Sequence, residues 1–132
     1  MVKEAGFGRK EKLKSRKRVE ELFAKGKSIN VFPIRISYQF VNVAEGEKAL
    51  MQVGVSVSKR YFKKAVDRNR IKRLLREAYR LQKKELSGLL AEQNKKGYVF
   101  FIYTDKQLPQ YNIVFDTMSK CLDALKRKLT IS

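Results

Sequence analysis

One segment, residues 66–84, restricts the possible folds of this chain more than any other. On a helical projection of about 100° per residue, its apolar residues share an arc of about 220–340° measured from Arg68: Ile71, Leu74, Leu75, Ala78 and Leu81. Its cations share about 0–160°, with Asn69 among them and Arg70 at the border: Arg68, Lys72, Arg73, Arg76, Arg80, Lys83 and Lys84. The pattern predicts a helix that packs on a sheet through one face and presents a stripe of cations on the other.

The cations of this helix are not balanced by neighbouring acids. Exposed helix faces usually place Glu four residues from Lys, because like charges at that spacing repel by about 0.2–0.5 kcal/mol per pair. Here like charges follow one another at that spacing without interruption: Arg68, Lys72, Arg76, Arg80 and Lys84. Glu77 is the one acid within the helix, since Asp67 stands at its start and favours the helix dipole. We expect a bound anion to offset this repulsion, and the planar guanidinium of Arg suits phosphate.

The charge of the whole chain points to a polyanionic partner. Its 132 residues contain 31 Lys and Arg against 13 Asp and Glu, a formal net charge of +18. That excess is larger than the roughly 2–8 charges that solubility asks of a small domain, and basic residues gathered in this way are typical of nucleic-acid binding. An anionic membrane or an acidic protein is the alternative partner. Residues 59–84 alone carry twelve cations and two acids.

Several kinds of chemistry are excluded by what the sequence lacks. There is no histidine, so no zinc site of the Cys/His type and no histidine base can form, and the single Cys121 permits no internal disulfide. The carboxylates are scattered and predict no two-metal site. No apolar run approaches a membrane span or a signal peptide. We expect one cytoplasmic domain over residues 1–132, with residues 1–10 mobile.

The rest of the chain predicts alternating helices and strands. Helical spacing is expected over 16–25, with Gly26 as a left-handed cap, and over 110–128, where Ile113 and Cys121 belong to a buried apolar stripe. Alternation predicts strands over 34–41 and 51–58, and the short turn between them favours an antiparallel pair. Asn94–Gly97 predicts a turn, and the apolar run 98–103 a strand buried on both faces. The polar face of the sheet is either solvated or the floor of a binding groove.

Two stretches of this sequence form a dense motif: Ser-Val-Ser-Lys-Arg over 56–60 and Ala-Val-Asp-Arg-Asn-Arg-Ile-Lys-Arg-Leu-Leu-Arg-Glu-Ala-Tyr-Arg over 65–80. Together they closely resemble the signature of the bacterial ribonuclease P protein component. Leu22, Phe23 and Gly26 extend the resemblance toward the N-terminus. It implies an α+β fold, an α/β sandwich of order αβββαβα, of the type named after the second domain of a small-subunit ribosomal protein. Its four-stranded, mostly antiparallel sheet would contain a left-handed βαβ crossover, with a short strand near 28–32.

The resemblance also implies the function. The family's protein binds a large catalytic RNA that, with Mg²⁺, removes the 5′ leader of precursor tRNA, so the polypeptide itself would hold no metal and do no catalysis. The side chains expected to contact the catalytic RNA are Lys59, Arg60, Lys63, Lys64, Arg68, Asn69, Arg70, Lys72, Arg73, Arg76 and Arg80. Because Asn69 is uncharged, it is the residue best suited to a directed hydrogen bond to a base or ribose.

The same resemblance implies a second surface, a cleft between the first helix and the sheet that takes the single-stranded leader. Phe23 matches an aromatic position there, whereas Val19 and Ser37 stand where the family often has aromatic residues, which predicts weaker stacking. Arg35, Gln39 and Gln52 would supply polar contacts. The expected partners are the catalytic RNA and precursor tRNA, with no DNA and no membrane. Alternatives are a ribosome-associated protein that binds structured RNA and a free-standing nuclease.

Overall fold

The computed structural model describes residues 12–13 and 15–131, so the expected mobility of residues 1–10 lies outside the described part of the chain. The elements in chain order are α1 (Arg16–Lys25), β1 (Lys27–Val31), β2 (Ile34–Asn42), β3 (Met51–Val57), α2 (Ala65–Gln82), α3 (Lys84–Gln93), β4 (Lys95–Tyr103) and α4 (Tyr111–Ile131). The expected α+β class is confirmed, and the short strand expected near 28–32 is β1. Among the described residues, no helix is long and apolar enough to cross a membrane.

The four strands form one sheet of order β1-β2-β4-β3. The predicted antiparallel pairing of 34–41 with 51–58 is therefore wrong, because β4 lies between β2 and β3. An apolar run such as 98–103 needs cover on both faces and a neighbour on both edges, which only a central position offers. β4 pairs antiparallel with β2 and parallel with β3. The chain makes the parallel pair by passing through α2 and α3 between the two strands.

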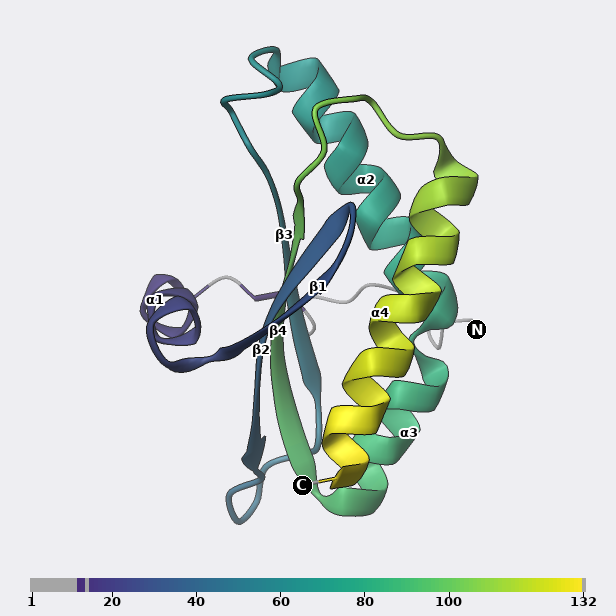
Figure 1. Ribbon diagram of the computed structural model, residues 1–132. Coiled ribbons are helices and arrows are strands. Elements are labelled where there is room, and N and C mark those ends of the chain that lie inside the picture. The colour runs from purple at the N-terminus through teal and green to yellow at the C-terminus, as the bar shows by residue number, and fades with distance from the viewer. Residues whose placement is uncertain (1–11, 14, 132) are drawn as a thin grey trace, which may run out of the picture.

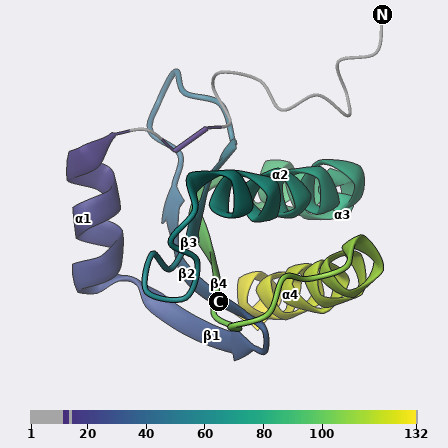
Figure 2. The same cartoon turned by 90° about the horizontal axis from the view of Figure 1, so that it is seen from above.

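The sheet separates two unequal helical layers. Figure 1 shows α1 on one side of the sheet and α2, α3 and α4 on the other, and Figure 2 shows the same division from above. The main core lies under the three helices and includes Ile36, Ile71, Leu75, Phe101 and Met118. A small second cluster under α1 contains Leu13, Leu22 and Tyr98. The single helix α1 therefore covers only part of its face of the sheet.

The helix α1 begins and ends for reasons that are local. The Ser15 hydroxyl accepts a hydrogen bond from the backbone N–H of Arg18 and caps the N-terminus. Gly26 ends the helix in an extended conformation (φ −73°, ψ 167°), so the expected left-handed cap is wrong. A side chain at Gly26 would instead press against the Leu22 carbonyl and lie 3.0 Å from the Tyr38 carbonyl. Glycine is needed here for close approach rather than for a positive φ.

The long basic helix is shorter than predicted and is followed by a second helix. α2 ends at Gln82, and residues 84–93 form α3, which the sequence interpretation missed. Lys83, expected on the cationic stripe, is only 6% exposed, whereas Leu81, expected on the apolar face, is 51% exposed. Tyr79 is buried instead and its ring lies 5.9 Å from that of Phe101. The buried arc of α2 is thus rotated because the helix packs against both β3 and α4.

The C-terminal half differs from the prediction in its details. Asn94 adopts the left-handed conformation that ends α3, and β4 begins at Lys95, so the expected turn over 94–97 is confined to its first residue. α4 runs to Ile131, and Ile113, expected in its buried stripe, is exposed. Cys121 is buried as expected, and burial raises the pKa of its thiol to about 12. It is a small core side chain rather than a reactive thiol.

Candidate nucleic-acid interface

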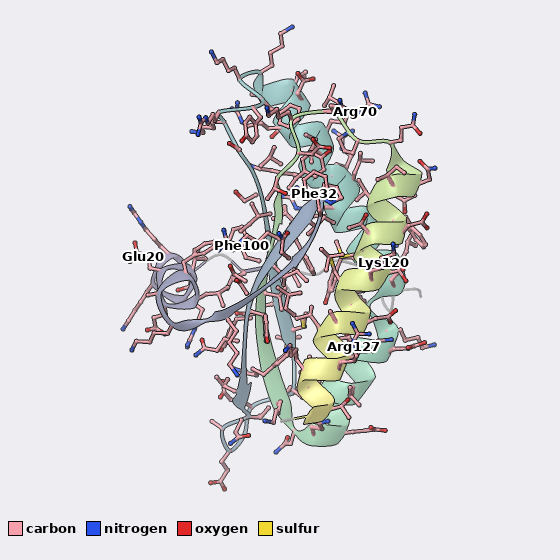
Figure 3. All side chains as sticks on the ribbon, in the orientation of Figure 1. Glu20, Phe32, Arg70, Phe100, Lys120 and Arg127 are labelled. Carbon is pink, nitrogen blue, oxygen red and sulfur yellow. The ribbon has the colours of Figure 1, made fainter. Side chains whose placement is uncertain are left out.

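The exposed face of α2 carries cations that have no acidic partner. Asn69, Arg70, Arg73 and Arg76 are exposed, and none of them has an ion pair or a side-chain hydrogen bond within the described chain. Figure 3 shows Arg70 extending from the upper part of α2, away from the sheet. Guanidinium groups presented in this way are available to bind phosphate. We call Asn69, Arg70, Arg73 and Arg76 the cationic face.

Arg80 of the expected stripe is already paired within the protein. The Arg80 guanidinium pairs with the Glu77 carboxylate, which raises the pKa of Arg80 and lowers that of Glu77. Lys72 is half-buried. The predicted uninterrupted ladder is therefore interrupted at Arg80, and the unpaired guanidinium groups of α2 lie before it, between Arg70 and Arg76.

Arg68 differs from the neighbouring cations because its guanidinium is hydrogen-bonded to the protein's own backbone. Its Nη1 donates hydrogen bonds of 2.8 Å to the carbonyl oxygens of Phe62 and Lys63, in the loop that connects β3 to α2. The Phe62 ring anchors the same loop in the core, 6.1 Å from the ring of Tyr103. Arg68 thus holds the loop that presents the other expected cations, all of which are exposed: Lys59, Arg60, Lys63 and Lys64. It is a positioning residue for that loop.

We expect Arg68→Ala to loosen the loop, because both carbonyl oxygens lose a charge-assisted donor, at a cost of about 1–3 kcal/mol. Amide hydrogen exchange over residues 58–64 should accelerate roughly tenfold or more for such a change. Arg68→Lys keeps the charge but not the planar fork, so it should restore little of the protection. Unchanged exchange in Arg68→Ala would show that the loop is held without this side chain.

The opposite face of the sheet, where α1 lies, is built from residues in register across the strands. One row reads Ser28, Ser37, Phe100 and Gly54 across β1, β2, β4 and β3, and the row beside it reads Asn30, Arg35, Ile102 and Ser56. Both rows carry small or polar side chains apart from Phe100 and Ile102. Phe23 on α1 is 51% exposed, and its ring lies 5.3 Å from that of Phe100 at an angle of 44°. Figure 3 shows Phe100 between α1 and the sheet.

A third row of side chains, on the same face of the sheet, is covered by α1. It contains Gln39, Tyr98 and Gln52 on β2, β4 and β3. Tyr98 packs with Leu22, and the Arg18 guanidinium lies 4.5 Å from the centre of its ring. The open floor therefore consists of the first two rows, with Phe23 and Phe100 forming an aromatic wall along it.

The glycine in the floor keeps this wall in place. A side chain at Gly54 would lie 2.9 Å from the ring of Phe100. Only glycine leaves Phe100 in its present position against Phe23. Neither Gly54 nor Phe100 was among the expected cleft residues. The alternation of residues 51–58 placed Gly54 on the polar face, but the register that brings it beside Phe100 is a property of the folded sheet.

The residues expected to line the cleft lie in three different environments. Phe23, Ser37 and Arg35 belong to the open floor and its wall, although Ser37 is only 6% exposed. Gln39 and Gln52 flank Tyr98 in the row that α1 closes. Val19 is half-buried and packs against the small cluster of Leu22 and Tyr98. Among the described residues, no group of carboxylates and cysteine is placed to hold a metal ion.

Comparisons with known proteins show the family of this chain. The family model described as Ribonuclease P matches residues 7–129. The chain belongs to the ribonuclease P protein family. The resemblance seen in residues 56–60 and 65–80 is thereby confirmed. As a member of this family, the chain is the protein component of an endoribonuclease holoenzyme that acts in tRNA processing.

Individual relatives of this ribonuclease P protein cover most of its length. The ribonuclease P protein component of Porphyromonas gingivalis is 37% identical over 117 residues, which span 89% of this chain and 84% of the relative. That of Chlorobium phaeobacteroides is 30% identical over 86% of this chain and 84% of its own. The structure of the Staphylococcus aureus RNase P protein superposes with a TM-score of 0.65 at 20% identity, covering 88% of this chain and 95% of the other. That likeness shows the fold.

Proposed function

We propose that this protein binds the catalytic RNA of ribonuclease P through the cationic face and the loop over residues 58–64, and the 5′ leader of precursor tRNA through the open floor. The observation that carries the proposal is the unpaired state of Arg70, Arg73 and Arg76 on one exposed face of α2. A surface of this kind is stabilised when phosphates neutralise it, with release of counterions from the RNA.

The two surfaces are joined through the chain itself. Ser56 belongs to the open floor, and Lys59 and Arg60 of the loop follow closely after it. The loop then leads into α2 at Ala65. An RNA strand that lies on the floor near β3 therefore meets the cations that would hold the catalytic RNA. We infer that the protein places the leader beside the RNA that cleaves it, so that the substrate is bound by both subunits.

The chemistry belongs to the RNA in this proposal. The Mg²⁺ that supports cleavage would be held by the holoenzyme's RNA and substrate, and the protein would contribute charge neutralisation and leader binding. The compartment that fits these partners is the bacterial cytoplasm. The alternative, a ribosome-associated protein, would use the same cationic face but would have no need of an aromatic wall beside an open floor.

Reconstitution with a ribonuclease P RNA tests the proposal. At low Mg²⁺, where RNA alone folds and binds substrate poorly, adding this protein should raise the rate of precursor-tRNA cleavage. The benefit should fall as salt rises, since about 6–10 phosphate contacts lose roughly 10³–10⁵ in affinity between 50 and 200 mM salt. Cleavage by the protein without RNA would indicate a free-standing nuclease, and binding to ribosomal RNA without any stimulation would indicate the ribosome-associated alternative.

A further inference from the structure

A pocket of about 370 Å³ lies at the β1 edge of the sheet, outside the open floor. The strand β1 begins at Lys27, opposite Tyr38, so β2 extends past it at Gln39 and Phe40 with no strand beside it on that edge. The pocket occupies this place. Lys25 of α1, Lys27 of β1, Lys95 of β4 and Lys128 of α4 surround it, and no acidic residue lines it.

The four cations of this pocket come from four elements and differ from those of a second pocket, which lies where the end of α2 and the start of α3 meet α4. That second pocket also contains two lysines, Lys84 and Lys126, but Glu85 and Asp123 line it as well. The Lys126 ammonium pairs with both carboxylates, at 2.6 and 3.1 Å. In the β1-edge pocket, Lys25, Lys27 and Lys95 have no ion pair within the described chain. A bound anion would offset the repulsion between these lysines.

The backbone is shaped to bring these lysines together. Gly26 separates Lys25 from Lys27 and packs directly on the Leu22 and Tyr38 carbonyls, which a side chain would forbid. Its absence of a side chain lets the end of α1 approach β2, with a lysine on each side of the contact. Gln39 adds a neutral polar group to the lining. Its Oε1 has no hydrogen-bond partner within the described chain, so that oxygen gives up no hydrogen bond when the amide turns toward a ligand.

We propose that this pocket binds a phosphodiester of the 5′ leader where the leader leaves the open floor, an inference that rests on the proposed function. Lys27 and Tyr38 follow Ser28 and Ser37 along their strands, and because successive side chains of a strand point to opposite faces, they lie on the α4 side of the sheet. A strand that crosses the floor from β3 toward β1 reaches these lysines where it passes over the β1 edge of the sheet. Gln39 lines the same pocket from the α1 face of β2, so its amide is placed to meet a ribose or base of the same nucleotide.

The test compares two precursor tRNAs in the reconstituted holoenzyme, with leaders of about 4 and about 16 nucleotides, the range of sites in single-strand-binding folds. Lys25→Gln/Lys27→Gln removes two pocket charges. We expect its affinity for the long-leader substrate to fall at least tenfold at about 0.1 M salt, and the salt slope to fall by about one for each phosphate that the variant no longer neutralises. Affinity for the short-leader substrate should stay within about twofold.

Lys106→Gln/Lys120→Gln is the matched control, since it removes two exposed lysines elsewhere and changes the net charge equally. Equal losses for both leaders, or equal losses in this control, would overturn the proposal. A fall in affinity for the catalytic RNA in place of the long leader would also overturn it and assign the pocket to that RNA. If the unaltered protein stimulates cleavage but gains nothing from the longer leader, the pocket proposal fails while the proposed function stands.

Discussion

Replacing Arg70, Arg73 and Arg76 together with alanine should lower the affinity for the ribonuclease P RNA by roughly 10²–10³ at about 0.1 M salt. Each guanidinium is exposed and unpaired within the described chain, so each is free to neutralise a phosphate. The slope of log K against log salt should fall by about three, one unit for each phosphate. Binding titrations at several salt concentrations measure both quantities.

The stability of the triple variant is part of the same expectation. These side chains make no ion pair or hydrogen bond within the described chain, and their removal relieves repulsion along α2, so the melting temperature should not fall. The matched control is Lys106→Ala/Lys120→Ala/Arg127→Ala, which removes three exposed cations from the loop before α4 and from α4 itself. Figure 3 shows Lys120 and Arg127 on that helix. If both variants lose affinity equally, net charge rather than the cationic face binds the RNA.

Phe23→Ala should weaken binding of precursor tRNA by the holoenzyme by about 5–150-fold, which corresponds to a stacking contribution of about 1–3 kcal/mol for one base. The Phe23 ring is half exposed beside Phe100, so one of its faces is open to a nucleobase. Affinity for mature tRNA, which has no leader, should be unchanged. The ratio of the two affinities is therefore the quantity to measure.

Two further variants separate stacking from loss of structure. Phe23→Tyr keeps an aromatic ring and should retain most of the preference for precursor over mature tRNA. Ile113→Ala removes an apolar side chain of similar exposure, 47%, from α4 on the other side of the sheet, and should leave the preference unchanged. Equal losses for precursor and mature tRNA in Phe23→Ala would show that Phe23 serves the fold or RNA assembly and that the leader lies elsewhere.

The cationic face illustrates what a helical pattern can predict. Arg73 and Arg76 lie on the exposed side as predicted, and Arg70, predicted at its border, is exposed as well, because a period of 3.6 fixes the order of residues around an isolated helix. The pattern does not fix how the helix rolls against its neighbours. Because α2 contacts α4 as well as β3, Tyr79 is buried and Leu81 is exposed. Arg68 donates hydrogen bonds to carbonyl oxygens of the preceding loop, which the helical pattern could not predict.

The floor of the cleft was predictable only in part. Alternation in 34–41 and 51–58 correctly separated an apolar face from a polar one, because successive side chains of a strand point to opposite sides. It could not show which strands are neighbours. The insertion of β4 between β2 and β3 put Phe100 between Ser37 and Gly54, and so created the aromatic wall with Phe23.

The sequence by itself determined the class of fold, the cationic face of α2, the buried nature of β4 and, through residues 56–60 and 65–80, the family. Periodicity, charge and a dense motif are properties of short segments, so they can be recognised in the sequence alone. Tertiary structure alone decided the strand order, the break between α2 and α3, the hydrogen bonds of Arg68 to its loop and the meeting of four lysines at the β1 edge. Each of these depends on contacts between residues far apart in sequence, and their free energies are set by packing that no single segment encodes.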